Sequence, residues 1–102
     1  MDAEAIRQKV IEVLKTCYDP EIPVDIWELG LIYDVAVGDD ASVAVRMTLT
    51  SPMCPVAESL PPEVEAKVGA LPEVSAATVE VTWDPPWNPD MMSEAARLEL
   101  NF

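Results

Sequence analysis

Histidine is absent from this chain of 102 residues. Its absence removes the usual general base near neutral pH, the cysteine–histidine pair of thiol enzymes, and every zinc site that uses an imidazole ligand. Enzyme mechanisms that depend on histidine are thereby excluded, and we expect a protein that is not an enzyme.

Cysteine is also scarce, with only Cys17 and Cys54 in the chain. Two cysteines are too few for a disulfide framework, and in a reducing compartment we expect both to be free thiols. A single bond between them stays open as an alternative.

Basic residues and long apolar runs are missing as well. Six basic residues against nineteen acidic ones give a formal net charge of −13, which repels phosphate backbones and anionic lipids. No run approaches the roughly 20 apolar residues of a membrane span, and the first residues are acidic, unlike a signal peptide. We expect a cytoplasmic protein that binds neither nucleic acid nor membranes.

What is present fits one compact domain over residues 1–102, since half of the residues are hydrophobic and a quarter are charged. A chain of this length buries only a small hydrophobic core, so a homodimer contact would add to its stability. Apolar periodicity and turn residues predict helices at 3–16, from Ser59 to about 69 or 70, and at 91–100. They predict strands at 31–37, 41–49 and 74–83, and a helical turn or bend at 24–30 in which Gly30 takes a positive φ.

This order is α-β-β-α-β-α, and it predicts an α+β fold of two layers. A small three-stranded mixed sheet would carry the helices on one face, and residues 38–40 would close a hairpin between the first two strands. Cys17 would lie on the buried face of the first helix.

Cys54 lies in a turn, residues 50–55, where an apolar strand stops and a helical pattern begins. Pro55 suits the first turn of a helix, which makes Cys54 a candidate cap residue with free amide donors near its sulfur. Such a position favours the thiolate, which attacks electrophiles and binds soft metals. The alternative is a buried cysteine that acts as a small hydrophobe.

Two further segments carry candidate site residues. Asp19 and Glu21 lie on a proline-rich loop, where they form either a carboxylate cluster or a solvated surface; a thiol enzyme using one of them as base is the least favoured hypothesis without histidine. The second segment combines tryptophans, prolines and methionines, and it either closes the core or forms a rigid docking surface. Its candidate contact residues are Trp83, Trp87, Met91 and Met92.

Four motifs together resemble the SufT-type metal–sulfur cluster assembly proteins. In sequence they are YDPEIPVDI at 18–26, LGLIYDV at 29–35, TLTSPMCP at 48–55, and WDPPW at 83–87 with MMSE at 91–94. They occur in the same order and span nearly the whole chain. The related PaaD-like subunit of phenylacetate degradation resembles the first motifs and the Cys54 region more than the tryptophan-rich loop.

The resemblance implies an accessory factor in iron–sulfur cluster assembly or delivery. It implies that Cys54, in a turn that also holds Thr50 and Pro52, contacts a cluster or a partner, and that Asp19 and Glu21 belong to the functional surface. The implied partners are SUF-type assembly proteins and recipient iron–sulfur apoproteins. The alternative is a non-catalytic interaction subunit of a phenylacetate-type oxygenase complex.

The cysteine count limits how a cluster could be held. Iron–sulfur clusters usually take four thiolate ligands, whereas this chain has two cysteines, of which Cys17 is expected in the core. We therefore expect no stably bound cofactor. A labile cluster would have Cys54 as a transient metal ligand, and it would be shared between two subunits or with a partner.

Overall fold

The structure is a computed structural model that describes residues 2–18, 23–49 and 56–100, without the side chains of 56–58. The elements in chain order are α1 (Ala3–Leu14), β1 (Ile32–Val37), β2 (Ser42–Met47), α2 (Val56–Gly69), β3 (Ala76–Val81), a 3-10 turn η1 (Pro89–Met91) and α3 (Glu94–Glu99). The predicted α-β-β-α-β-α order is confirmed, with η1 in addition. Within the described ranges, no helix is both long and apolar enough to cross a bilayer.

The sheet has the order β1-β2-β3, with β2 in the centre. β1 and β2 pair antiparallel, as the predicted hairpin requires, and β3 pairs with β2 in parallel. A parallel neighbour needs a crossover connection, and α2 lies within it. The predicted mixed sheet is therefore confirmed.

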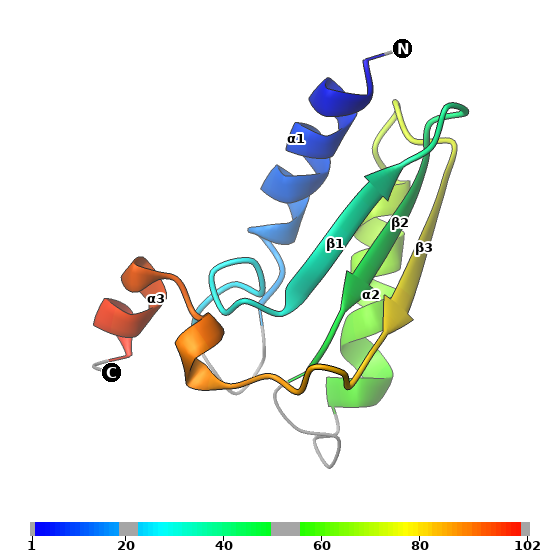
Figure 1. Ribbon diagram of the computed structural model, residues 1–102. Coiled ribbons are helices and arrows are strands. Elements are labelled where there is room, and N and C mark those ends of the chain that lie inside the picture. The colour runs from blue at the N-terminus through cyan, green and yellow to red at the C-terminus, as the bar shows by residue number, and fades with distance from the viewer. Residues whose placement is uncertain (1, 19–22, 50–55, 101–102) are drawn as a thin grey trace.

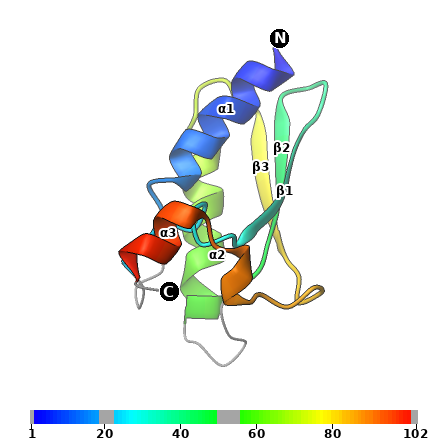
Figure 2. The same ribbon diagram turned by 60° about the vertical axis from the view of Figure 1, so that its left-hand side comes forward.

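The helices α1 and α2 both lie against one face of this sheet, which gives two layers (Figures 1 and 2). The other face, called here the open face, exposes alternate residues of the three strands. They are Asp34, Ala36, Ala44, Arg46, Ala76, Thr78 and Glu80.

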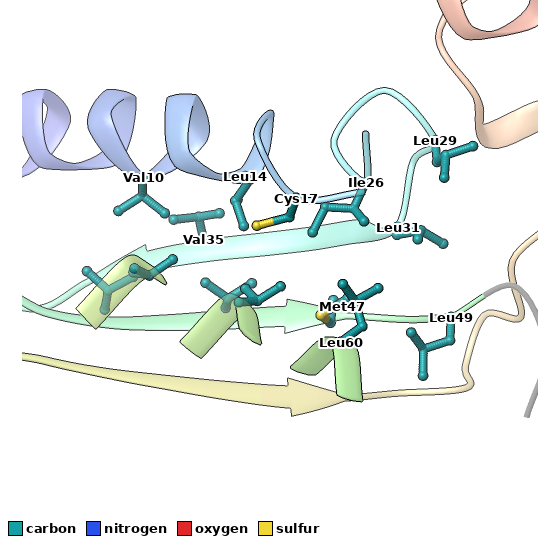
Figure 3. Packing of buried hydrophobic residues seen from close by; sticks show 14 of the residues in the cluster. Val10, Leu14, Cys17, Ile26, Leu29, Leu31, Val35, Met47, Leu49 and Leu60 are labelled. Carbon is teal, nitrogen blue, oxygen red and sulfur yellow. The ribbon is translucent and has the colours of Figure 1, made fainter. Parts of the chain in front are cut away.

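The core lies between the sheet and the two helices (Figure 3). Val43, Val45 and Met47 alternate along β2 toward the helices, and each is at most 2% exposed. Cys17 is fully buried in this core as predicted, but it follows the end of α1 at Leu14 and does not lie on a face of the helix. Burying a side chain of this kind contributes about 1.5–3 kcal/mol, so the middle strand anchors the fold.

α1 begins where the Asp2 side chain accepts hydrogen bonds from the amides of Glu4 and Ala5, at 3.1 and 3.2 Å. Such a cap satisfies amides that have no partner in the first turn of a helix. The helix ends at Leu14, two residues before the predicted end at Thr16. The prediction of this helix is confirmed.

The predicted start of α2 after Ser59 is wrong. The helix begins at Val56, so Pro61 and Pro62 lie inside it rather than in its first turn. Each proline removes one helical hydrogen bond. The prediction was wrong because proline is common in the first turn of a helix, and the two prolines were therefore placed there. Burial of Leu60, Val64 and Val68 against the sheet stabilises the helix in spite of them.

The predicted start of the last helix at Met91 is also wrong. The side chain of Ser93 accepts a hydrogen bond from the Ala96 amide at 3.1 Å and caps α3, which begins at Glu94. Met91 belongs instead to η1, which Asn88 caps by accepting from the Asp90 amide at 2.8 Å. Two capping side chains thus divide what the apolar pattern predicted as one helix.

Candidate functional site at the end of the sheet

The predicted Cys54 turn follows the end of the central strand. Thr48, next after β2, donates its amide hydrogen bond to Leu31 O at 2.8 Å, and Met47 O accepts from the Thr82 amide at 2.8 Å. The strand is thus held on both sides just before the turn. Thr50, Pro52 and Cys54 themselves lie outside the described residues, so their predicted roles stay predictions.

Backbone hydrogen bonds connect the first motif, residues 18–26, to the end of β2. The Ile26 amide donates to Cys17 O at 2.8 Å, and the Leu31 amide donates to Ile26 O at 3.1 Å. Together with the bond between Thr48 and Leu31, these contacts join the end of α1 to the end of β2. Asp19 and Glu21 lie outside the described residues.

Residues 25–30 form the turn that the sequence predicts. The Asp25 side chain accepts from the Glu28 amide at 3.0 Å, and Gly30 has φ +79° as expected. A Cβ atom at Gly30 would overlap the backbone carbonyl of Met91. Only glycine therefore allows the second motif to pack directly against the fourth.

Three hydrogen bonds fasten the tryptophan-rich segment to this turn and to β1. Trp87 Nε1–H donates to Leu29 O at 2.7 Å, the Ser93 amide donates to Glu28 O at 2.8 Å, and the Tyr33 hydroxyl donates to Pro85 O at 2.7 Å. The described parts of all four motifs are thus linked at the end of the sheet where β1 begins and where β2 and β3 end.

The four candidate docking residues differ in exposure. Met92 is 6% exposed and belongs to the core, whereas Trp87 and Met91 are half-buried. Trp83 is 42% exposed. The segment therefore closes the core through Met92 and Trp87 and presents Trp83 to the outside, while its docking role stays a prediction.

A groove of about 550 Å³ runs between β1 and this segment. It is lined by Tyr33 on one side and by Pro85 and Met91 on the other, with Arg46 at the open face of the sheet. Arg46 Nε lies 3.8 Å from Glu80 Oε1. The sequence did not single out Tyr33 or Arg46, although Tyr33 lies within the second motif.

Cys17 is poorly suited to hold a metal. It is fully buried, and its Sγ–H donates to Val13 O at 3.6 Å. Burial raises the pKa of this thiol, and the nearby Lys67 charge offsets that only in part. In the described part of the chain, no group of three or more cysteine or carboxylate side chains could hold a metal ion.

The sequence model of the iron–sulfur cluster assembly protein family matches residues 7–81, which include most of α1, the whole sheet, α2 and the residue Cys54. The chain belongs to this family. The resemblance of the four motifs is thereby confirmed. The match ends before the tryptophan-rich segment, which the structure joins to the other motifs.

Two relatives and one solved structure match this chain over most of their own lengths. A Porphyromonas gingivalis protein named Fe-S protein maturation auxiliary factor is 48% identical over 95 residues, 93% of this chain and 90% of the relative. A Staphylococcus aureus protein named Fe-S protein maturation auxiliary factor SufT is 42% identical over 82 residues, 80% of this chain and 93% of the relative. The crystal structure of a domain of unknown function from Bacillus anthracis has a TM-score of 0.92 at 37% identity, covering 98% of this chain and 95% of that chain.

Proposed function

We propose that this protein is an accessory factor that helps iron–sulfur clusters to assemble or to reach recipient proteins. The observation that carries the proposal is the 48% identity, over 93% of the chain, to a protein named as an iron–sulfur protein maturation auxiliary factor. The names of both curated relatives favour this role over that of a subunit of a phenylacetate-type oxygenase. They also support a non-enzymatic role in the bacterial cytoplasm.

The proposed contact with the cluster is Cys54. Cys17 is closed off in the core, and burial keeps its thiol in the protonated form that binds metals poorly. One cysteine supplies one thiolate, so the cluster is a passing cargo whose other ligands come from a second subunit or from a SUF-type or recipient protein. The hydrogen bonds on both sides of β2 hold the residues that lead into the Cys54 motif.

Anaerobic reconstitution with iron and sulfide tests the direct carrier form of this proposal. We expect visible absorption from a bound cluster in the wild type and in Cys17→Ala, and its loss in Cys54→Ser. Cys17→Ala is the matched control, because it removes the buried thiol instead. Equal absorption in wild type and Cys54→Ser would count against cluster contact through Cys54.

A deletion strain tests the accessory role itself. We expect lower activity of iron–sulfur enzymes without the protein, restoration by the wild type and by Cys17→Ala, and no restoration by Cys54→Ser at equal protein level. Enzymes without iron–sulfur clusters serve as the control. Normal activity of the iron–sulfur enzymes in the deletion strain would refute the role.

A further inference from the structure

The outer edge of β3 has backbone groups that pair with no other described strand. β3 is the last strand of the sheet and forms its right-hand edge in Figure 1. The Thr82 amide points toward β2, where it bonds Met47 O at 2.8 Å. Because backbone groups alternate in direction along a strand, those of Ala77, Val79 and Val81 point away from β2. In the described ranges, no other strand pairs with this edge.

This edge also lacks the features that usually prevent strand pairing. β3 keeps its register with β2 from Ala76 to Val81, contains no proline, and has Glu80 as its one charged residue. The opposite edge strand, β1, is interrupted by a register shift between Ile32 and Asp34. Bulges, prolines and charges are the ordinary means of blocking an edge, so β3 is the better template for an added strand.

A groove lies beside this edge, between α2 and β3. It has a volume of about 570 Å³ and mostly small or rigid lining residues: Pro61, Pro62, Glu65, Ala66, Gly69 and Ala77. The residues of β3 on the helix side, Ala77, Val79 and Val81, stay half-exposed even though α2 packs there. An added strand would direct alternate side chains toward this groove and cover them.

The negative charge around the outer edge of β3 indicates which kind of partner strand would bind there. Residues 56–82 contain five glutamates and one lysine. Three of the glutamates lie near a basic side chain: Glu63 is 3.5 Å from Lys67, Glu73 is 3.0 Å from Lys9, and Glu80 is 3.8 Å from Arg46. Glu65, which lines the groove itself, forms no ion pair with a described basic side chain, so the groove keeps its negative charge. A second copy would bring the same negative charge to the same edge, and each copy has a net charge of −13. A strand with basic side chains would instead be attracted.

We propose that the outer edge of β3 binds an extended, basic segment of a partner protein as a fourth strand of the sheet. Backbone hydrogen bonds to β3 provide the pairing, alternate apolar side chains lie toward the groove between α2 and β3, and the basic ones lie toward Glu80 on the open face. This inference goes beyond the iron–sulfur role and does not depend on it.

A synthetic peptide tests the pairing. The probe is Lys-Val-Arg-Val-Thr-Val-Arg-Val-Lys with blocked ends, and its affinity is measured by fluorescence anisotropy. In one control peptide the backbone nitrogens of the valines are methylated, and in a second the backbone nitrogens of the lysines, arginines and threonine are methylated. If the peptide pairs antiparallel to β3, the valine amides form the hydrogen bonds; if it pairs in parallel, the amides of the other residues form them. We expect one control to bind at least about tenfold more weakly than the probe, because two or three hydrogen bonds are lost.

Variants of the protein locate the binding edge. Val79→Pro removes an outward amide and leaves the bonds to β2, so it should weaken binding by at least about tenfold. Val37→Pro is the matched control, since Val37 is a half-buried valine on the opposite edge strand. Ala66→Phe places a large side chain in the groove from the exposed side of α2. This variant should weaken binding, although the sequence of β3 is unchanged. Thermal unfolding confirms that each variant is folded.

Two outcomes would overturn the proposal. Equal binding of the probe and both methylated peptides would mean attraction by charge alone. A dimer seen by sedimentation equilibrium, and abolished by Val79→Pro but not by Val37→Pro, would make a second copy the occupant. Cluster binding by Cys54 can fail without changing either result, so the two proposals are tested separately.

Discussion

Gly30 is the residue whose replacement should most disturb the candidate site. Its φ of +79° is unfavourable for any other residue, and an added Cβ would overlap the Met91 carbonyl. We expect Gly30→Ala to lower the free energy of unfolding by at least about 1–3 kcal/mol, the usual cost of a left-handed non-glycine residue. Urea denaturation measures this loss.

Gly69→Ala is the matched control for that change. A Cβ at Gly69 would lie 3.7 Å from the Ala77 Cβ, an ordinary contact, and Gly69 ends a helix. Alanine is favoured over glycine in helices by about 0.5–1 kcal/mol, so this variant should be neutral or slightly more stable. Equal losses in both variants would show that the contact with Met91 is not special.

Cys17 should make stability depend on pH in the alkaline range. Burial raises the pKa of its thiol above the ordinary value of about 8.5 that it has in the unfolded chain. The stability from the neutral thiol is therefore fully present below about pH 8.5 and is lost as the pH rises through the folded pKa. We expect wild type to lose stability more steeply than Cys17→Ala as the pH rises above about 8.5.

Urea denaturation across that pH range checks the difference. The two proteins differ only at residue 17, so only the difference between the two curves reports Cys17. The cavity left by alanine lowers stability equally at every pH. Parallel curves would contradict the raised pKa.

Among the structural elements, the segment after β3 depends on one hydrogen bond in particular. Trp87 Nε1–H donates to Leu29 O at 2.7 Å from a half-buried ring. Trp87→Phe keeps most of the ring but leaves this carbonyl without its donor, which should cost about 1–3 kcal/mol. Trp83→Phe changes a tryptophan that is 42% exposed, and we expect less than about 0.5 kcal/mol.

Thermal unfolding of the two variants, with wild type as reference, makes the comparison. Hydrogen exchange of the Ser93 amide, which bonds Glu28 O, should become faster in Trp87→Phe and stay unchanged in Trp83→Phe. If Trp83→Phe proved the more damaging change, the assignment of the anchoring tryptophan would be wrong.

The helices and strands differ in how well the local sequence predicted them. The alternation of Val43, Val45 and Met47 predicted a strand with one buried face, because a strand turns successive side chains to opposite sides. The start of α2 could not be predicted, since Pro61 and Pro62 usually stand at a helix start and here tertiary burial overrides that preference. The start of α3 was predicted at Met91 from the apolar pattern, which does not report the cap that the Ser93 side chain forms.

At the scale of the whole molecule, the four motifs could be identified from the sequence, but their arrangement in space was not predicted. Their contacts join residues far apart in the chain, such as Trp87 with Leu29 and Tyr33 with Pro85. Local periodicity does not contain such pairs. The groove beside Tyr33 and the open edge of β3 were missed for the same reason, since both depend on how the strands are ordered.

The net charge of −13 predicts a response to salt. Like charges repel each other in the compact state, and salt screens them over a Debye length of about 10 Å at 0.1 M. We therefore expect the melting temperature to rise by a few degrees between about 0.02 M and about 0.5 M sodium chloride. Differential scanning calorimetry measures the change.

Removal of exposed acidic charges tests the cause. Asp39→Asn combined with Glu99→Gln should reduce the rise with salt, because both side chains are exposed and carry negative charge. An unchanged salt response in this double variant would point to a bound ion instead of general repulsion.

The close packing of Gly30 against Met91 has a further consequence for synthesis of the chain. Ribosomes add about 5–20 residues per second, so α1 and the β1–β2 hairpin are available for several seconds before residue 91 exists. During that interval the turn at 25–30 has neither Met91 nor Trp87 to pack against. The end of the sheet that joins the four motifs therefore stays incomplete until residue 91 has been made, although α1 and the hairpin are already present.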